Sequence, residues 1–157
     1  MIEESIERAK IFDCEFLTGA YNGALCVRAS RWSDDFTMDD HRKAIVGNLK
    51  ELSKILDGTG ITFALENHID FSGKEIASFI EDVAEDNIRV QYDFGNAACI
   101  HLDPMNDVEY LAPYAVTAHF KDFKVRDNKH WLDSYPAMPQ LSSGCYLGEG
   151  MVDFDVI

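Results

Sequence analysis

The sequence predicts an α/β fold, a partial (β/α)8 TIM barrel in which about five parallel strands alternate with helices. First, segments with helical periodicity alternate with short segments rich in β-branched and aromatic residues. Second, each of the later strand segments has one apolar and one polar face. Third, acidic and histidine residues recur on the polar faces at intervals of 27 and 26 residues, near the roughly 31 residues of one βα unit.

Length and composition favour a single domain over residues 1–157, because this length suits one hydrophobic core. Hydrophobic residues make up 46% and charged residues 27%, which excludes a disordered chain. The net charge of −14 argues against a nucleic-acid partner, because phosphate binding needs clustered Lys and Arg. No apolar run approaches a membrane span, and the four cysteines form no C-x-x-C pair. We therefore expect a cytoplasmic protein with reduced thiols and no membrane partner.

The first half of the chain predicts two helices and two strands in alternation. Residues Ile2–Phe12 have helical composition, and Ala24–Ser30 has the pattern of a strand. Thr37–Asp40 is a capping box that begins a helix, and Gly58 ends that helix. The strand Ile61–His68 follows at once.

The second half continues the alternation of helices and strands. The predicted elements are a helix begun by the capping box Ser72–Glu75, a strand at Arg89–Phe94, a short helix begun by Asp103-Pro104, a strand at Val116–Phe120, a long loop containing Trp131 and Tyr135, and a last strand and turn in Tyr146–Ile157.

Strand parity places Glu66, Asp93 and His119 on the polar faces of three successive strands, at one height. A doubly wound sheet would be apolar on both faces, whereas the inside of a barrel near its C-terminal mouth carries polar active-site residues. Two carboxylates and one imidazole suit a divalent ion such as Mn²⁺, Mg²⁺, Co²⁺ or Zn²⁺. The alternative is three polar side chains that only form hydrogen bonds at strand ends.

Four sequence stretches resemble the xylose-isomerase-like TIM barrels, the sugar phosphate isomerase/epimerase superfamily. These stretches are Ala64–His68, Tyr92–Asn96, Ala118–Asp122 and Leu147–Gly150, the last followed by Val152-Asp153. The resemblance implies that Glu66, Asp93 and His119 are ligands of one divalent metal ion, with Mn²⁺ the first choice. The family's fourth ligand, a Glu on the final barrel strand, would lie beyond Ile157. The chain therefore resembles the middle and late βα units of such a barrel.

The resemblance implies a metal-dependent isomerase or epimerase of small sugars or related hydroxy-carbonyl compounds. Glu66 would be the catalytic base that moves the proton next to the carbonyl, through a metal-stabilised enediolate. His68, Lys121 and Arg28 are candidates for binding the substrate. Whether the chain is itself an enzyme stays open, because the second carboxylate of the proton shuttle is not encoded in it.

Several alternatives remain at this point. The chain could be a non-catalytic barrel fragment that keeps a partial metal site, or an abasic-site endonuclease-like metal hydrolase, a related barrel family. Lys121 could instead pair with Asp122 or Glu149, His68 could be a core residue, and Glu149 could replace the missing ligand. An open segment of a barrel would expose strand edges, so self-association through those edges is also expected.

Overall fold

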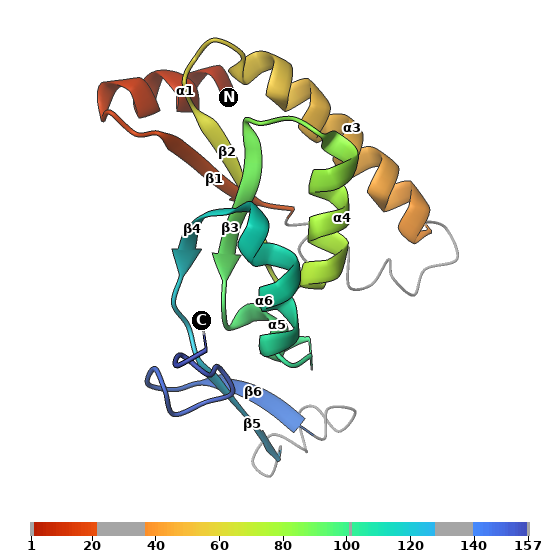
Figure 1. The fold of residues 1–157 in the computed structure, drawn as a ribbon, viewed down its shortest axis with the longest axis vertical. Coiled ribbons are helices and arrows are strands. Elements are labelled where there is room, and N and C mark those ends of the chain that lie inside the picture. Colours follow the sequence, from red (N-terminus) through yellow and green to blue (C-terminus); the bar gives the residue numbers. More distant parts are fainter. Residues whose placement is uncertain (1, 22–36, 101, 128–139, 157) are drawn as a thin grey trace.

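A computed structural model describes residues 2–21, 37–100, 102–127 and 140–156 of the chain (Figure 1). Its main sheet has four parallel strands in the order β1-β2-β3-β4. These strands are β1 (Phe16–Ala20), β2 (Thr62–Glu66), β3 (Ile88–Asp93) and β4 (Ala115–His119). An antiparallel pair, β5 (Phe123–Asp127) and β6 (Gln140–Gly144), lies beyond the carboxyl ends of β3 and β4 in Figure 1. The parallel sheet with intervening helices confirms the α/β class and the partial barrel.

One helix precedes the first strand of the sheet, and the others lie between successive strands. They are α1 (Ile2–Ile11), α3 (Met38–Leu56), α4 (Gly73–Val83), the single turn α5 (Asn96–Cys99) and α6 (Met105–Leu111), which continues as a 3-10 turn at Ala112–Tyr114. Figure 1 shows α3, α4 and α6 side by side on the same side of the sheet. None of the helices in these ranges has the length and hydrophobicity that a membrane span requires.

Both predicted capping boxes are present. The Thr37 side chain accepts the Asp40 N–H at 3.2 Å, and the Asp40 carboxylate accepts the Thr37 N–H at 2.9 Å. Ser72 and Glu75 repeat this exchange at the start of α4. Each box satisfies backbone donors that a helix start leaves free, which is why these motifs locate helix starts from sequence.

The core lies between the apolar face of the sheet and the helices. Ile61 and Leu65 from the β2 segment, and Val90 and Tyr92 from β3, are almost fully buried. They share one cluster with helix residues, among them Ile45, Leu49, Leu56, Ile76, Ile80 and Val83. Burying each such side chain contributes about 1.5–3 kcal/mol, so this face anchors the strands that carry the polar residues.

The first strand lies earlier in the chain than the sequence pattern indicates. The structure has β1 at Phe16–Ala20, paired with β2 through Gly19 opposite Leu65. The pattern around Thr18-Gly19 is typical of a turn, yet pairing with β2 satisfies this backbone in extended form. A Cβ on Gly19 would lie 3.1 Å from the ring of Phe63, so the glycine makes room for that ring. The expected strand Ala24–Ser30 lies outside the described residues.

The C-terminal region also differs from the expectation. The predicted strand in Tyr146–Ile157 is wrong, because residues 145–156 form turns and irregular backbone. The antiparallel strands β5 and β6 instead occupy the two ends of the expected long loop. The polar segment Gln140–Gly144 has little strand character alone and becomes a strand by pairing with β5. Trp131 and Tyr135 lie outside the described residues.

Strands β1 and β4 are the edges of the four-stranded sheet as far as the structure describes the chain. Val116 on β4 and Phe120 just after it are exposed. An edge strand with exposed apolar side chains is a template for pairing with another chain. Self-association through these edges stays a prediction.

Candidate metal centre

The three predicted ligands are the last residues of three neighbouring strands. Glu66 ends β2, Asp93 ends β3 and His119 ends β4. Asp93 is paired in register with His119, whereas Glu66 is opposite Gln91, two residues before Asp93. The expected common height is therefore replaced by a stagger between β2 and β3, as closure of a barrel requires. A stagger of two residues preserves the face, so all three side chains still lie together.

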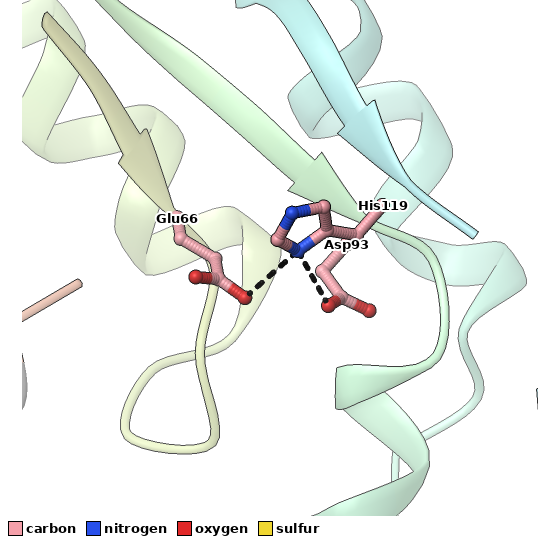
Figure 2. A group of neighbouring side chains, drawn as sticks. All are labelled: Glu66, Asp93 and His119. Atoms are coloured by element: carbon pink, nitrogen blue, oxygen red, sulfur yellow. Dashed lines mark ion pairs between the residues drawn. The ribbon is translucent and has the colours of Figure 1, made fainter. Parts of the chain in front are cut away.

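The side chains of Glu66, Asp93 and His119 form a tight cluster (Figure 2). One ligand atom from each lies within 4.8 Å of the others. His119 Nδ1 is 3.5 Å from Glu66 Oε1 and 3.5 Å from Asp93 Oδ2. The exposed fractions of the side chains are 0% for Asp93, 15% for Glu66 and 50% for His119. The cluster is therefore closed at Asp93 and open to solvent at His119.

The two oxygens of the Asp93 carboxylate have different surroundings. Its backbone N–H donates to Asn67 Oδ1 at 2.7 Å, and Asn67 Nδ2 donates to the Asp93 carbonyl at 3.0 Å. Its Oδ1 accepts the Gly95 N–H at 3.2 Å. Its Oδ2 is buried and accepts no well-aligned hydrogen bond. A buried carboxylate oxygen without a hydrogen bond is stabilised by a cation.

Amide side chains orient the other two members of the cluster. Asn96 Nδ2 lies 3.4 Å from Glu66 Oε1 and also donates to the Asn67 carbonyl at 3.1 Å. Gln91 Nε2 lies 3.3 Å from His119 Nδ1. Sequence reasoning did not assign these amides to the site. Gln91 shares the face of Asp93, and Asn67 follows Glu66 directly, so parity and adjacency were the available signals.

Lys121 also reaches the cluster. Its Nζ lies 2.6 Å from Asp93 Oδ2 and 4.0 Å from Glu66 Oε1. The expected alternative paired Lys121 with Asp122 or Glu149, and the structure pairs it with the carboxylates of the cluster instead. Glu149 is exposed and pairs with Lys124 at 3.1 Å, so it is not a member of the cluster.

Asp122 anchors the segment that contains Glu149. Its carboxylate accepts backbone N–H groups from Phe123, Gly148, Gly150 and Val152 at 2.7–3.1 Å. Burial raises the pKa of Asp122, but these four hydrogen bonds outweigh it and lower the pKa below its usual value. A Cβ on Gly150 would collide with the Asp122 carboxylate, so glycine is required there.

Two predicted substrate contacts lie apart from this cluster or outside the described residues. His68 is in the loop after β2, where its Nδ1 is buried 3.5 Å from Asp70 Oδ2. Arg28 lies outside the described residues. Contact of either residue with a substrate stays a prediction.

The donor set fits a divalent metal ion. Two carboxylates and an imidazole match the ligand preferences of Mn²⁺, Mg²⁺, Co²⁺ and Zn²⁺. Asp93 Oδ2 is a buried oxygen whose neighbour is the mobile ammonium group of Lys121, so a metal ion can take the place of that group. Glu66, Asp93 and His119 are thus the residues able to hold the ion.

Solved structures with the same fold are similar to this chain at low sequence identity. A xylose isomerase-like TIM barrel protein from Mycobacterium smegmatis in complex with magnesium has a TM-score of 0.69 at 20% identity, over 94% of this chain and 50% of that protein. The IOLI protein with a bound zinc atom has a TM-score of 0.68 at 16% identity, over 98% and 51%. A D-allulose 3-epimerase from Methylomonas sp. has a TM-score of 0.61 at 17% identity, over 96% and 46%.

The chain thus spans about half the length of these solved proteins. Among curated proteins, the uncharacterized protein YihM of Escherichia coli strain K12 is 24% identical over 87 residues, which is 48% of this chain and 27% of YihM. The family model described as the xylose isomerase-like TIM barrel matches residues 1–157. The chain belongs to the xylose isomerase-like TIM barrel family.

Proposed function

We propose that this chain provides the metal centre of a divalent-metal-dependent isomerase or epimerase that acts on small sugars or related hydroxy-carbonyl compounds. The observation that carries the proposal is the convergence of Glu66, Asp93 and His119 at the carboxyl ends of three parallel strands. Active sites of TIM barrels lie at this end of the strands. Membership in the family and the similarity to a D-allulose 3-epimerase support the same reaction class.

Glu66, Asp93 and His119 would hold one divalent ion. Mn²⁺ is our first choice, and Mg²⁺, Co²⁺ and Zn²⁺ suit the same ligands. Structures of similar proteins contain magnesium and zinc. When bound, the ion supplies Lewis acidity toward a substrate carbonyl and its neighbouring hydroxyl.

Glu66 is the proposed base that takes the proton from the carbon next to the carbonyl. It is partly exposed, and Asn96 orients one of its carboxylate oxygens. Return of the proton to the neighbouring carbon gives isomerisation, and return to the opposite face gives epimerisation. Asp93 is fully buried and bound by Gly95, so it is suited to holding a cation and not to moving a proton.

Lys121 is the proposed contact for an anionic or hydroxyl group of the substrate. Its ammonium group lies at the cluster on a side chain that is 42% exposed, so it reaches both the carboxylates and the solvent. His68 and Arg28 are the other proposed substrate contacts. Nothing in these contacts selects one sugar.

A non-catalytic domain that binds the metal is the second candidate function. It is favoured because the cluster found among the described residues contains only one carboxylate, Glu66, that is free to move a proton. An abasic-site endonuclease-like activity is less favoured. The Asn96 amide is engaged with Glu66 and Asn67, and the net charge of −14 opposes binding to DNA.

Metal analysis combined with deuterium exchange tests the proposal. The chain is dialysed, loaded with Mn²⁺ and incubated in D₂O with a panel of ketoses and aldoses, and NMR measures deuterium at the carbon next to the carbonyl. This readout needs only one base, so it detects Glu66 even where net turnover is small.

We expect one Mn²⁺ per chain and exchange that falls at least about tenfold in Glu66→Gln. Glu149→Gln is the matched control, because Glu149 is an exposed carboxylate outside the cluster. Exchange that survives in Glu66→Gln and disappears in Glu149→Gln would show that the base is wrongly assigned. Metal binding without exchange on any sugar would favour the non-catalytic candidate.

A further inference from the structure

Lys121 supplies a positive charge at the point where the cluster requires one. Asp93 Oδ2 is buried, accepts no well-aligned hydrogen bond and lies 2.6 Å from Lys121 Nζ. The same Nζ lies 4.0 Å from Glu66 Oε1. The ammonium group therefore stabilises the two carboxylates to which we assign the metal ion.

The approach of Lys121 to the cluster is built into the backbone. Gly95, two residues after Asp93, has an ordinary φ of −93°, so its role is not conformational. A Cβ at Gly95 would lie 2.9 Å from the Cβ of Lys121 and 2.9 Å from the Lys121 carbonyl oxygen. Because Gly95 has no side chain, the backbone and Cβ of Lys121 can lie against the turn that follows Asp93.

We propose that Lys121 is an internal counter-cation that competes with the metal ion for Asp93 and Glu66. This inference rests on the metal site of the proposed function. In the absence of metal, the ammonium group neutralises the buried carboxylate and keeps the cluster assembled. When metal binds, the ammonium group moves toward the solvent, where its hydration compensates for the contact that it loses.

Competition follows from charge and from the flexibility of the lysine stem. A metal ion and an ammonium group that contact the same carboxylate oxygen lie close together, so their positive charges repel each other. The lysine side chain has a flexible four-carbon stem, so its ammonium group can move away while the backbone stays in place. The site therefore binds metal less tightly than its three ligands alone would, which makes the ion exchangeable.

Lys124 provides a matched control three residues along the chain. Its ammonium group pairs with Glu149 at 3.1 Å, and its exposed fraction is similar to that of Lys121. Lys121→Met and Lys124→Met change the net charge equally, so a difference between them reports the position of the charge. Lys121→Gln is a second variant that keeps a polar side chain.

Titration calorimetry with Mn²⁺ on the full chain tests the proposal, together with thermal unfolding in a chelator. We expect Lys121→Met and Lys121→Gln to bind Mn²⁺ about tenfold more tightly than the unsubstituted chain, and Lys124→Met to bind as the unsubstituted chain does. In the chelator, the two Lys121 variants should unfold at a lower temperature, and Mn²⁺ should remove that difference.

The outcomes separate this inference from the proposed function. Equal or weaker Mn²⁺ binding by both Lys121 variants would overturn the inference and leave the metal site intact. Binding by the Lys121 variants but not by the unsubstituted chain would support the competition and count against a metal-dependent activity of this chain. Absence of binding in every variant would overturn both.

Discussion

Two buried carboxylates at the ends of neighbouring strands are stabilised by different kinds of partner. Asp93 ends β3, and Asp122 follows β4 by three residues. Asp122 accepts four backbone N–H groups, and both of its oxygens are used. Asp93 accepts one backbone N–H through Oδ1, and its Oδ2 faces the ammonium group of Lys121 and the imidazole of His119.

The difference separates a structural carboxylate from the one that we propose as a metal ligand. Backbone N–H groups keep their positions while the chain is folded, so Asp122 stays hydrogen-bonded to the segment Gly148–Val152. Side-chain cations can move, which is why we propose that Asp93 exchanges the Lys121 ammonium group for a metal ion. Asp107 is a third case, because it accepts the Gly73 N–H while burial raises its pKa to about 6.

The largest effect on stability is expected from Asp122→Ala. Loss of the carboxylate leaves several partly buried N–H groups without an acceptor, at about 1–3 kcal/mol for each donor that water does not reach. We expect the free energy of unfolding to fall by about 4 kcal/mol in urea denaturation. Because Asp122 has a lowered pKa, its contribution is present above the unfolded pKa near 4 and is lost at lower pH. If the free energy of unfolding fell by less than about 1 kcal/mol, Asp122 would not be a structural carboxylate in the sense that separates it from Asp93.

A smaller effect is expected from Asp107→Asn, and it depends on pH. Burial raises the pKa of Asp107 to about 6 from an ordinary value of 3.8, with Glu75 adding to the increase. The folded state therefore binds the proton more tightly, and stability falls as pH rises from about 4 to about 6. Asparagine still accepts the Gly73 N–H but does not titrate.

Urea denaturation at pH 4 and pH 7 measures this difference. The free energy of unfolding of Asp107→Asn, minus that of the unsubstituted chain, should be about 2–3 kcal/mol higher at pH 7 than at pH 4. A difference that does not change with pH would show that Asp107 carries no raised pKa.

The smallest effect on stability is expected from Asp93→Asn, which sharpens the comparison. The amide oxygen can still accept the Gly95 N–H, and Lys121 is exposed enough to be hydrated once it loses its partner. We expect a change within about 1 kcal/mol in urea denaturation, but Mn²⁺ binding weakened at least about tenfold in calorimetry. Unchanged affinity would contradict the assignment of Asp93 as a ligand.

Local patterns in the sequence were enough for the elements that depend on neighbouring residues. The capping boxes at Thr37 and Ser72 are decided within four residues, so both helix starts were predictable. The parity of Glu66, Asp93 and His119 depends only on position along each strand. It placed all three on one face even though the register between β2 and β3 is staggered.

Contacts between distant residues required the tertiary structure. Phe16–Ala20, which contains Gly19, and Gln140–Gly144, which is mostly polar, are strands because each pairs with a neighbouring strand. Lys121 contacts Asp93 because the two segments approach closely at Gly95. Asp122 accepts hydrogen bonds from N–H groups up to 30 residues away along the chain. The sequence by itself determined which residue types share a face. Only packing decided which cation meets which carboxylate, because that depends on distances between segments that no local pattern encodes.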